Sequence, residues 1–346
     1  MANADNWSSA SLKAVQDGGL IREDVMQQIW DISNIPLPLT DMIASDDCGN
    51  SYAEWTTDKL AAPDITNAVV DGSDATANNA KGGARVGNQC QISVKNVIVT
   101  SRADSSEVVG RSNELAYQVM ERQKELRRDR EAIYLTQQAS VADNGDNVAG
   151  KLGGLGAWLV TNVSRGATGA NGGFSNGVVA APTPGTVRAL SETMIRDIAQ
   201  AVWEQGGNPT TLMSVPAVIR KLSEYMFTES ARIATLSSDV GQQKSAKVAQ
   251  GSVNVFVTDF GVTLEMVANR LQPVVSAVSG SENANVYIID PQYIRESFKR
   301  GYQVEELAKS GLSSKRLMSV DGTLKVLNEA AHGVIADIDY TEAVVA

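Results

Sequence analysis

The sequence predicts an α+β fold in which a long helix and an extended β-hairpin accompany a separate α/β unit. Residues 105–139 carry apolar positions at helical spacing and contain no proline. Residues 51–104 contain two strand-like segments that flank a long polar stretch. From residue 185 to residue 292, helical patterns alternate with short strand patterns, as they do in α/β units. The 346 residues are enough for one large or two ordinary domains with a buried core.

Composition excludes many kinds of catalytic and metal site. The chain has 40 Asp+Glu against 30 Lys+Arg, a net charge of −10, with one histidine (His332) and two cysteines. One imidazole excludes metal sites built on two or three histidines, and two thiols exclude four-thiolate sites. Because no nucleotide-binding, hydrolase or calcium-loop motif occurs either, we expect no enzyme activity, no cofactor and no metal. The acidic balance argues against a protein that grips nucleic acid through excess basic side chains.

The sequence shows neither a secretory signal nor a membrane-spanning segment. Its N-terminal residues contain no basic stretch followed by an apolar one. Its longest apolar runs are a few residues, far short of the ~20 needed to cross a bilayer. We therefore expect a product that is cytoplasmic or assembled from a cytoplasmic pool, without membrane contact.

Residues 1–50 are expected to form an extended arm with one helical stretch. Val25, Met26, Ile29 and Trp30 recur at helical spacing. The segment 35–39 then carries two prolines, each of which fixes φ and disfavours helix in the residue before it. The arm either wedges against the core or clasps a partner, and the sequence leaves both readings open.

Residues 51–104 are expected to form a long hairpin with a weakly packed tip. Residues 52–58 are strand-prone, and residues 89–94 alternate between polar and apolar. Between them, residues 61–88 are almost wholly Ala, Asp, Asn, Gly, Ser and Thr. A long tip with little to bury is unusual in a compact monomer, so we expect it to lie on a neighbouring subunit.

The same hairpin predicts two free thiols. Antiparallel pairing of its arms would set residues near 60 opposite residues near 90. Cys48 and Cys90 would then lie at opposite ends, too far apart for a disulfide.

Residues 105–139 are predicted to form one helix on the order of 50 Å long, at ~1.5 Å per residue. Its apolar positions step by sevens and fours: Val108, Leu115, Val119, Leu126 and Ile133. The cluster Arg127–Arg130 could be a phosphate-binding patch or a solvated, ion-paired face between subunits. Since acidic residues are interleaved with the arginines, we favour the second reading.

The rest of the chain divides into a glycine-rich connector, an α/β unit and a strand-rich tail. Residues 140–185 contain several glycine clusters, but no Gly-Lys-Ser/Thr follows, so a connector is favoured over a phosphate loop. The segment 185–292 holds the alternating helices and strands. In the tail, Asp321-Gly322 between apolar segments predicts a hairpin turn.

Eight short segments then occur in collinear order over nearly the whole chain. They are Ile35-Pro36-Leu37-Pro38-Leu39-Thr40-Asp41-Met42-Ile43, Tyr52-x-Glu54-Trp55-x-x-Asp58-x-Leu60, Gly110-Arg111-x-x-Glu114-Leu115-Ala116-Tyr117-Gln118, Glu125-Leu126-x-Arg128-Asp129-x-Glu131, Gly154-Leu155-Gly156-Ala157-Trp158-Leu159-x-Thr161-Asn162, Asn208-Pro209-Thr210-Thr211, Thr258-Asp259-Phe260-Gly261 and Asp290-Pro291-x-Tyr293. Together they resemble the major capsid (head) proteins of tailed bacteriophages with the Hong-Kong-97-type capsid fold, most closely the podovirus-like head proteins.

This resemblance implies a division of the chain into the parts of a capsid subunit. They are an N-terminal arm (1–50), an extended loop (51–104), a peripheral domain with its spine helix (105–185, helix 105–139), an axial domain (186–290), and the peripheral sheet with the C-terminus (291–346). Only about 50 residues precede the extended loop, without the long coiled scaffolding segment of some relatives. A separate scaffolding protein is therefore expected if one is needed.

The resemblance also implies the function. The chain would be a virion protein, assembled in the host cytoplasm, that forms an icosahedral or prolate shell through pentamers and hexamers. Its partners would be its own copies, a portal protein, possible separate scaffolding and decoration proteins, and packaged double-stranded DNA in weak, non-specific contact. The alternatives are a tail or connector component, a nucleic-acid-binding module, or an α/β enzyme with an oligomerisation arm.

Contacts between subunits are expected on the extended loop and the spine helix. The candidates are Trp55, Asp58, Lys59, Lys81, Arg85, Arg111, Glu114, Arg127, Arg128 and Glu131.

Overall fold

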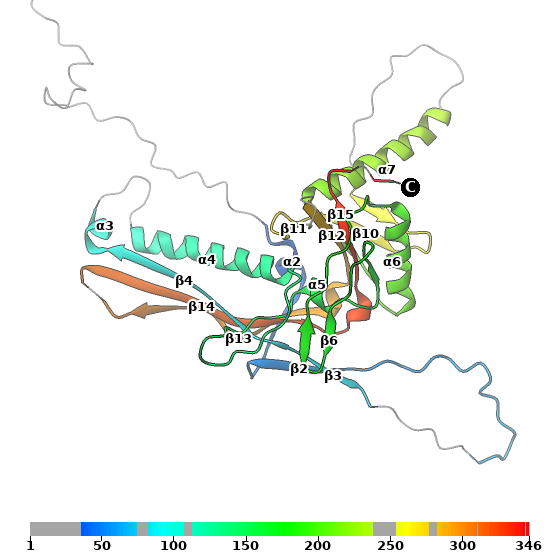
Figure 1. Ribbon diagram of the computed structural model, residues 1–346, viewed down its shortest axis with the longest axis horizontal. Helices are drawn as coiled ribbons and strands as arrows, with labels where there is room; N and C mark the ends of the chain where they lie inside the picture. Colours follow the sequence, from blue (N-terminus) through cyan, green and yellow to red (C-terminus); the bar gives the residue numbers. More distant parts are fainter. Residues whose placement is uncertain are drawn as a thin grey trace, which may run out of the picture.

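A long four-stranded sheet with a helix along one face forms one end of the molecule, in a computed structural model (Figure 1). The structure describes residues 36–74, 82–106, 113–237, 254–276, 282–309, 311–342 and 344–345. Within these ranges the sheet order is β1-β13-β14-β4. The strands are β1 (Ala44–Asp47), β4 (Gln91–Thr100), β13 (Ile294–Leu307) and β14 (Ser313–Val326). β1 pairs with β13 in parallel and the other pairs are antiparallel, so β1 and β4 are the outer strands.

The helix on this sheet is α4 (Glu114–Tyr134). Its seam residues Leu115, Val119 and Leu126 pack on apolar side chains of β4 and β14, which confirms the predicted amphipathic pattern. The predicted span 105–139 is wrong at both ends, because Asn113 caps α4 and Leu135 ends it. Residues Ser101–Ser105 form a separate short helix, α3, and residues 107–112 lie outside the described ranges. The helix is therefore ~31 Å long.

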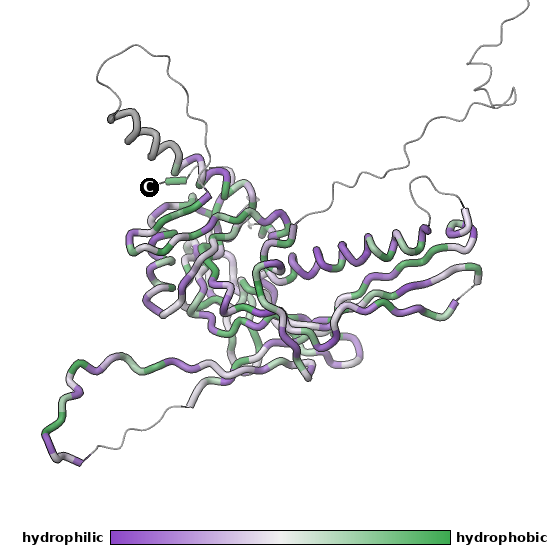
Figure 2. The backbone as a smooth tube through the Cα atoms, turned by 180° about the vertical axis from the view of Figure 1, so that it is seen from behind, coloured by the Kyte–Doolittle hydropathy of each residue, from purple (hydrophilic) through white to green (hydrophobic). Residues whose placement is uncertain are grey.

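The hairpin of the extended loop is shorter than predicted and has another register. β2 (Tyr52–Thr57) pairs antiparallel with β3 (Ala84–Gln89), so that Tyr52 faces Gln89. The alternating residues that suggested the second arm of the hairpin belong mostly to β4, which pairs with β14. Between β2 and β3 the chain runs far out from the body, and Figure 2 shows hydrophobic and hydrophilic residues mixed along this excursion.

This register brings the two cysteines together and contradicts their predicted separation. Cys48 follows β1 and Cys90 lies between β3 and β4, and their Sγ atoms are 3.7 Å apart. Both are free thiols in the structure, but not for the reason that the sequence suggested.

A second, larger sheet carries the α/β part of the chain. Within the described residues its order is β5-β15-β12-β8-β10-β9, with β11 paired to β12. The strands are β5 (Val163–Ser164), β8 (Thr211–Ser214), β9 (Val255–Val257), β10 (Thr263–Ala268), β11 (Val275–Ser276), β12 (Glu282–Ile289) and β15 (Gly333–Asp339). Helices α6 (Glu192–Glu204) and α7 (Pro216–Ser237) pack on it. Because β15 comes from the tail, the predicted boundary near residue 290 cuts through this sheet.

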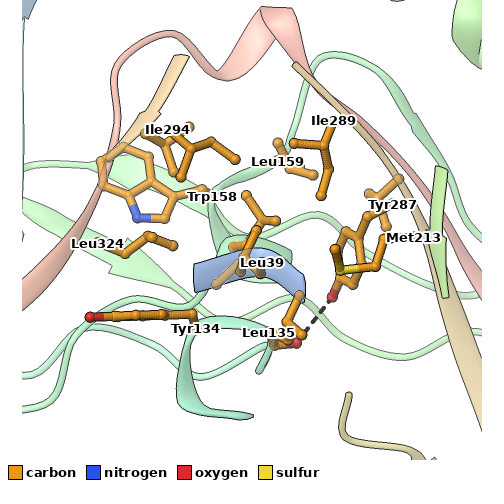
Figure 3. Close-up of a cluster of buried hydrophobic side chains, with 14 of the residues drawn as sticks. Leu39, Tyr134, Leu135, Trp158, Leu159, Met213, Tyr287, Ile289, Ile294 and Leu324 are labelled. Atoms are coloured by element: carbon orange, nitrogen blue, oxygen red, sulfur yellow. Dashed lines mark hydrogen bonds between the residues drawn. The ribbon is translucent and has the colours of Figure 1, made fainter. Parts of the chain in front are cut away.

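The central strands of the larger sheet, β8, β12 and β15, are buried on both faces. Along β12, Val286 and Ile288 join the cluster under α6 and α7, whereas Tyr287 and Ile289 join a second cluster on the other face, the central core. Leu39 of the short helix α2 (Pro38–Met42) lies in the middle of the central core (Figure 3). Side chains from both sheets surround it, among them Met213 and Tyr287 of the larger sheet and Ile294 and Leu324 of the four-stranded sheet, together with Tyr134 of α4 and Trp158. The central core therefore joins the two sheets.

The glycine-rich segment 140–185 is part of this core, which corrects its interpretation as a connector. It contains α5 (Leu155–Trp158) and the small hairpin of β6 (Gly173–Ser175) and β7 (Val178–Ala180). Leu155 and Trp158 are buried in the central core. A Cβ on Gly154 would lie 2.2 Å from the carbonyl oxygen of Thr136, so glycine is required for this close approach.

The tail has no hairpin turn at Asp321-Gly322. These residues lie inside β14, which runs unbroken past them. A Cβ on Gly322 would lie 2.6 Å from a carbonyl oxygen of β13 and 3.1 Å from the Arg130 guanidinium. The glycine therefore admits a buried side chain from α4. No helix in the described ranges is both long and apolar enough to cross a membrane.

Candidate inter-subunit surfaces

The extended loop is the most exposed part of the described chain. From Asp58 to Asp74 every side chain is exposed. Four of these side chains are large and apolar: Leu60, Ile65, Val69 and Val70 are 94%, 97%, 81% and 79% exposed. Our description of the tip as having little to bury overlooked them, although they are visible in the sequence as apolar residues in a polar tract. Isolated apolar side chains are common on surfaces, but four on one excursion indicate a contact surface.

The base of the extended loop is fixed to its own subunit. Trp55 packs against Trp158, with ring centroids 5.4 Å apart, and Trp158 stacks on Phe174 at 5.7 Å. On β3, the buried Asn88 side chain donates to the carbonyl oxygens of Gly153 and Leu324 at 3.1 and 2.8 Å. Trp55, predicted as a contact between subunits, is thus half-buried in a contact within the subunit.

The charged candidates of the loop lie at the surface near this base. Asp58 accepts a hydrogen bond from the Lys59 backbone, and Lys59 Nζ donates to Gln205 Oε1 at 2.5 Å, close to the end of α6. Arg85 pairs with Glu54 across the β2–β3 hairpin, and its side chain is 72% exposed. An ion pair this exposed contributes little to the stability of the subunit. Lys81 and Arg111 lie outside the described residues.

The N-terminal half of α4 borders a groove. The groove has a volume of about 340 Å³ and lies between α3, α4 and the outer strand β4, with Glu114, Gln118 and Arg122 on its helical side. Glu114 is half-buried there and accepts a hydrogen bond from Gln118 Nε2 at 2.9 Å. On the face of β4 turned away from α4, Ile92, Val94 and Ile98 are 51%, 47% and 58% exposed. The outer strand thus offers both an edge and an apolar face.

The C-terminal half of α4 is partly interior. Arg127 is exposed and Arg128 is half-buried, whereas Glu131 is fully buried. The Glu131 carboxylate accepts hydrogen bonds from the Leu39 and Thr40 amides, both at 2.8 Å, and from Asn269 Nδ2 at 2.7 Å. It therefore caps the N-terminus of α2 within its own subunit. Its prediction as a contact between subunits is wrong.

Arg130 contradicts both readings of the Arg127–Arg130 cluster, because it is neither a phosphate ligand nor a surface residue. Its side chain is fully buried and donates to the carbonyl oxygens of Gln91 and Gly322, both at 3.3 Å, and to the Tyr134 hydroxyl. Tyr134 in turn donates to Glu296 Oε1 at 2.5 Å. Burial raises the pKa of Tyr134 well above its usual value, and burial raises that of Glu296 against the opposing effects of Tyr134 and Arg130. The sequence could not locate this network, because its members are far apart along the chain.

His332 is buried beside η3 (Glu329–Ala331). Its Nδ1 accepts a hydrogen bond from the Asp290 amide at 3.2 Å, and burial lowers its pKa to about 4. In the part of the chain that the structure describes, no three His, Cys, Asp or Glu side chains come together as metal ligands would.

Comparisons with known proteins agree with this geometry. The SU10 major capsid protein family matches residues 6–339. The major capsid protein of Escherichia phage Phieco32 is 26% identical over 330 residues, which cover 86% of this chain and 89% of that protein.

Solved capsid structures share the fold. The capsid of a native GTA particle has a TM-score of 0.57 at 11% identity and covers 96% of this chain and 99% of its own. The capsid of cyanophage P-SCSP1u has a TM-score of 0.53 at 13% identity, and the match covers 96% of this chain and 98% of that chain. The holo-SrpI encapsulin of Synechococcus elongatus PCC 7942 has a TM-score of 0.54 at 11% identity, and the match covers 95% of this chain and 97% of that chain. At these identities the likeness shows the fold alone, which confirms the predicted Hong-Kong-97-type capsid fold.

The family match extends over nearly the whole chain, and the collinear curated relative is itself a phage major capsid protein. These findings confirm the predicted function of a phage major capsid protein. The chain belongs to the SU10 major capsid protein family.

Proposed function

We propose that this chain assembles through pentamers and hexamers into an icosahedral or prolate shell around a phage double-stranded DNA genome. The observation that supports the proposal is the extended loop, whose large apolar side chains are exposed and are not covered by the described part of their own subunit. A segment that leaves one subunit and is buried on the next makes a head-to-tail contact. Such contacts close into rings when the rotation between subunits is a simple fraction of a turn.

The energy available from the loop is large enough to direct assembly. Burying one Leu, Ile or Val side chain stabilises by ~1.5–3 kcal/mol. Leu60, Ile65, Val69 and Val70 together would supply several kcal/mol per contact. Repeated around a ring, a contact of this size makes a closed assembly far more stable than an open one.

Each part of the subunit would then have its own role in the shell. In this proposal the arm (1–50) reaches a neighbour through the part before Pro36, because Leu39 and β1 belong to the subunit's own core and sheet. Residues 51–104 form the extended loop and 105–185 with most of 291–346 form the peripheral domain. The axial domain at the five- and six-fold centres is 186–290, whose sheet also takes up β15 from the tail. The surface candidates Asp58, Lys59, Arg85, Glu114, Arg127 and Arg128 would meet neighbouring copies, and Lys81 and Arg111 are proposed with them.

The other proposed partners follow from the chemistry of the chain. A net charge of −10 suits a wall that contains DNA without condensing onto it, so DNA contact would be weak and non-specific. A portal protein and, where needed, scaffolding and decoration proteins would complete the particle. Assembly would take place in the host cytoplasm, and no enzymatic step is part of the proposal.

The test combines microscopy with a substitution on the loop. The full chain, expressed and purified, should form shells, rings or capsomers in negative stain. The variant Ile65→Ser/Val69→Ser/Val70→Ser should melt at the wild-type temperature, because these side chains are exposed, yet fail to assemble. The variant Asp64→Asn/Asp71→Asn, on the same loop, should assemble normally because it removes no apolar surface.

Two results would overturn the proposal. One is a wild-type chain that remains a small, stable oligomer under all assembly conditions, as an enzyme or connector component would. The other is normal shell formation by the triple serine variant, which would show that the loop does not direct assembly.

A further inference from the structure

The two cysteines of the chain lie side by side although 42 positions separate them in sequence. Their Sγ atoms are 3.7 Å apart, which is van der Waals contact, so no other atom lies between them. Cys90 is buried and Cys48 is half-buried. Backbone hydrogen bonds hold both positions, from the Cys48 amide to the Phe298 carbonyl at 2.9 Å and from the Cys90 amide to the Ser51 carbonyl at 2.7 Å.

The pair also occupies a special place in the fold. Cys48 follows β1 and Cys90 precedes β4, and these are the two outer strands of the four-stranded sheet. The chain between the cysteines contains the whole β2–β3 hairpin and the extended loop. A covalent bond here would tie the two outer strands together and close the base of the loop into a ring.

We propose that Cys48 and Cys90 are a disulfide modification site, which a low-molecular-weight disulfide such as oxidised glutathione converts from two thiols to a cystine. Closing the bond requires the sulfurs to approach from 3.7 Å to ~2 Å. Rotation about the Cα–Cβ bonds is the movement that would bring the two sulfurs together.

Exposure sets the order of the two exchange steps. The Cys48 thiolate attacks one sulfur of oxidised glutathione and expels a glutathione thiolate, which leaves a mixed disulfide on Cys48. The Cys90 thiolate then attacks Cys48 Sγ and expels the second glutathione. Two protein thiols are oxidised, one glutathione disulfide is reduced to two thiols, and the two protons released by the cysteines pass to these products.

Burial suits Cys90 to the second step. It raises the pKa of Cys90 to about 12, with a further contribution from the neighbouring Cys48. A thiol this weakly ionised reacts slowly with dissolved disulfides, but it is already in contact with the sulfur that it must attack. Under the assembly route proposed above, release from a reducing cytoplasm would supply the change of redox environment.

The test uses the reduced, full-length subunit before assembly, so that its outcome does not depend on shell formation. After incubation with oxidised glutathione at pH 8, wild type should have no free thiol, a mass lower by two hydrogens, and a cross-linked peptide that contains both cysteines. Its melting temperature should rise by about 5 °C, the size expected for closing a ring of this length in 346 residues. Dithiothreitol should reverse all of these changes.

Single variants separate the two steps. Cys90→Ser should stop at the mixed disulfide and carry one glutathione on Cys48, whereas Cys48→Ser should keep its Cys90 thiol free. Neither should gain thermal stability. The proposal is overturned if wild type retains both thiols, accumulates glutathione adducts, or links subunits to one another instead of Cys48 to Cys90. Rapid labelling of Cys90 in Cys48→Ser would overturn the order of the steps.

Discussion

Replacing Glu131 by glutamine keeps the size of a buried side chain but removes one of its two acceptor oxygens. Oε1 accepts from the Leu39 amide at 2.8 Å and from Asn269 Nδ2 at 2.7 Å. Oε2 accepts from the Thr40 amide at 2.8 Å and from the Thr40 hydroxyl at 2.5 Å. A glutamine amide that keeps its oxygen toward Leu39 and Asn269 turns N–H groups toward Thr40. The Thr40 amide is then left without an acceptor, and the Thr40 hydroxyl loses its charged acceptor.

The size of the effect follows from the two lost hydrogen bonds. A buried hydrogen bond to a charged group contributes ~1.5–3 kcal/mol, so Glu131→Gln should lower the free energy of unfolding by about 3–6 kcal/mol. For 346 residues the entropy of unfolding is ~0.7 kcal/mol per kelvin. The melting temperature should therefore fall by about 4–8 °C, which differential scanning calorimetry of the unassembled subunit would measure.

A matched substitution on the same helix shows whether burial is the cause. Glu125 forms an ion pair with Arg122 at 2.5 Å, but its side chain is 34% exposed. Glu125→Gln should shift the melting temperature by no more than about 1 °C, because exposed pairs contribute little. If Glu131→Gln melts with the wild type, or if the two variants fall equally, the carboxylate does not hold α2 in the way described here.

Three further predictions concern packing, close approach and protonation. Leu126→Ala should lower the free energy of unfolding, measured by urea titration, by about 2–5 kcal/mol, because Leu126 is 1% exposed. Met120→Ala, at a position 46% exposed on the same helix, should change it by about 0.5 kcal/mol or less. Gly322→Ala should lower the free energy of unfolding by about 1–3 kcal/mol, since its Cβ would lie 2.6 Å from a carbonyl oxygen. Gly301→Ala, whose Cβ would have no atom within 4 Å, should be nearly neutral. Equal effects of the two substitutions would refute the close approach at Gly322. His332 has a pKa of about 4 in the folded state against 6.5 in the unfolded state. The stability that its neutral form contributes is therefore complete above pH 6.5 and is lost as the pH falls toward 4. Wild type should lose about 2 kcal/mol more than His332→Asn between pH 7.5 and 5, and parallel pH profiles would contradict this.

The features that the sequence predicted well are those set by local periodicity. The apolar seam of α4 repeats at helical spacing, and Leu115, Val119 and Leu126 do face the sheet. The helices and strands between residues 185 and 292 follow in the same way from their own patterns. Periodicity did not reveal where α4 begins and ends, because Asn113 caps it by a local hydrogen bond and the residues after Tyr134 are drawn into the central core.

Strand register could not be predicted, because it is fixed by distant partners. Residues 91–94 alternate as a hairpin arm would, and they pair with β14, more than two hundred positions away, instead of with β2. The register of β2 and β3 is anchored by Trp55 on Trp158 and by Asn88 on Gly153, contacts that no local pattern encodes. Because the hairpin register was predicted wrongly, the distance between Cys48 and Cys90 was predicted wrongly as well.

The candidate surfaces were predicted in part. The charged candidates Asp58, Lys59 and Arg85 are exposed in the structure. The exposed apolar residues of the loop were not among the predicted candidates. A run of mixed charges such as 127–131 reads as a solvated face whether or not its members are buried. Only the fold shows that two of those side chains, Arg130 and Glu131, are buried inside the subunit.

Arg130 and Glu131 show how one helix can serve both the interior and the surface. Adjacent residues on a helix point ~100° apart, so Arg130 reaches β4 and β14 while Glu131 reaches α2. Burying such charges costs desolvation that their hydrogen bonds only partly offset, so they contribute less to net stability than to a unique alignment of α4. A fixed α4 fixes the outer strand β4 that it covers, and Cys90 and the extended loop are attached to the start of that strand. The exposed stretch from Asp58 to Asp74 can therefore be long, while the buried end of α4 helps to determine the direction in which the loop leaves the subunit.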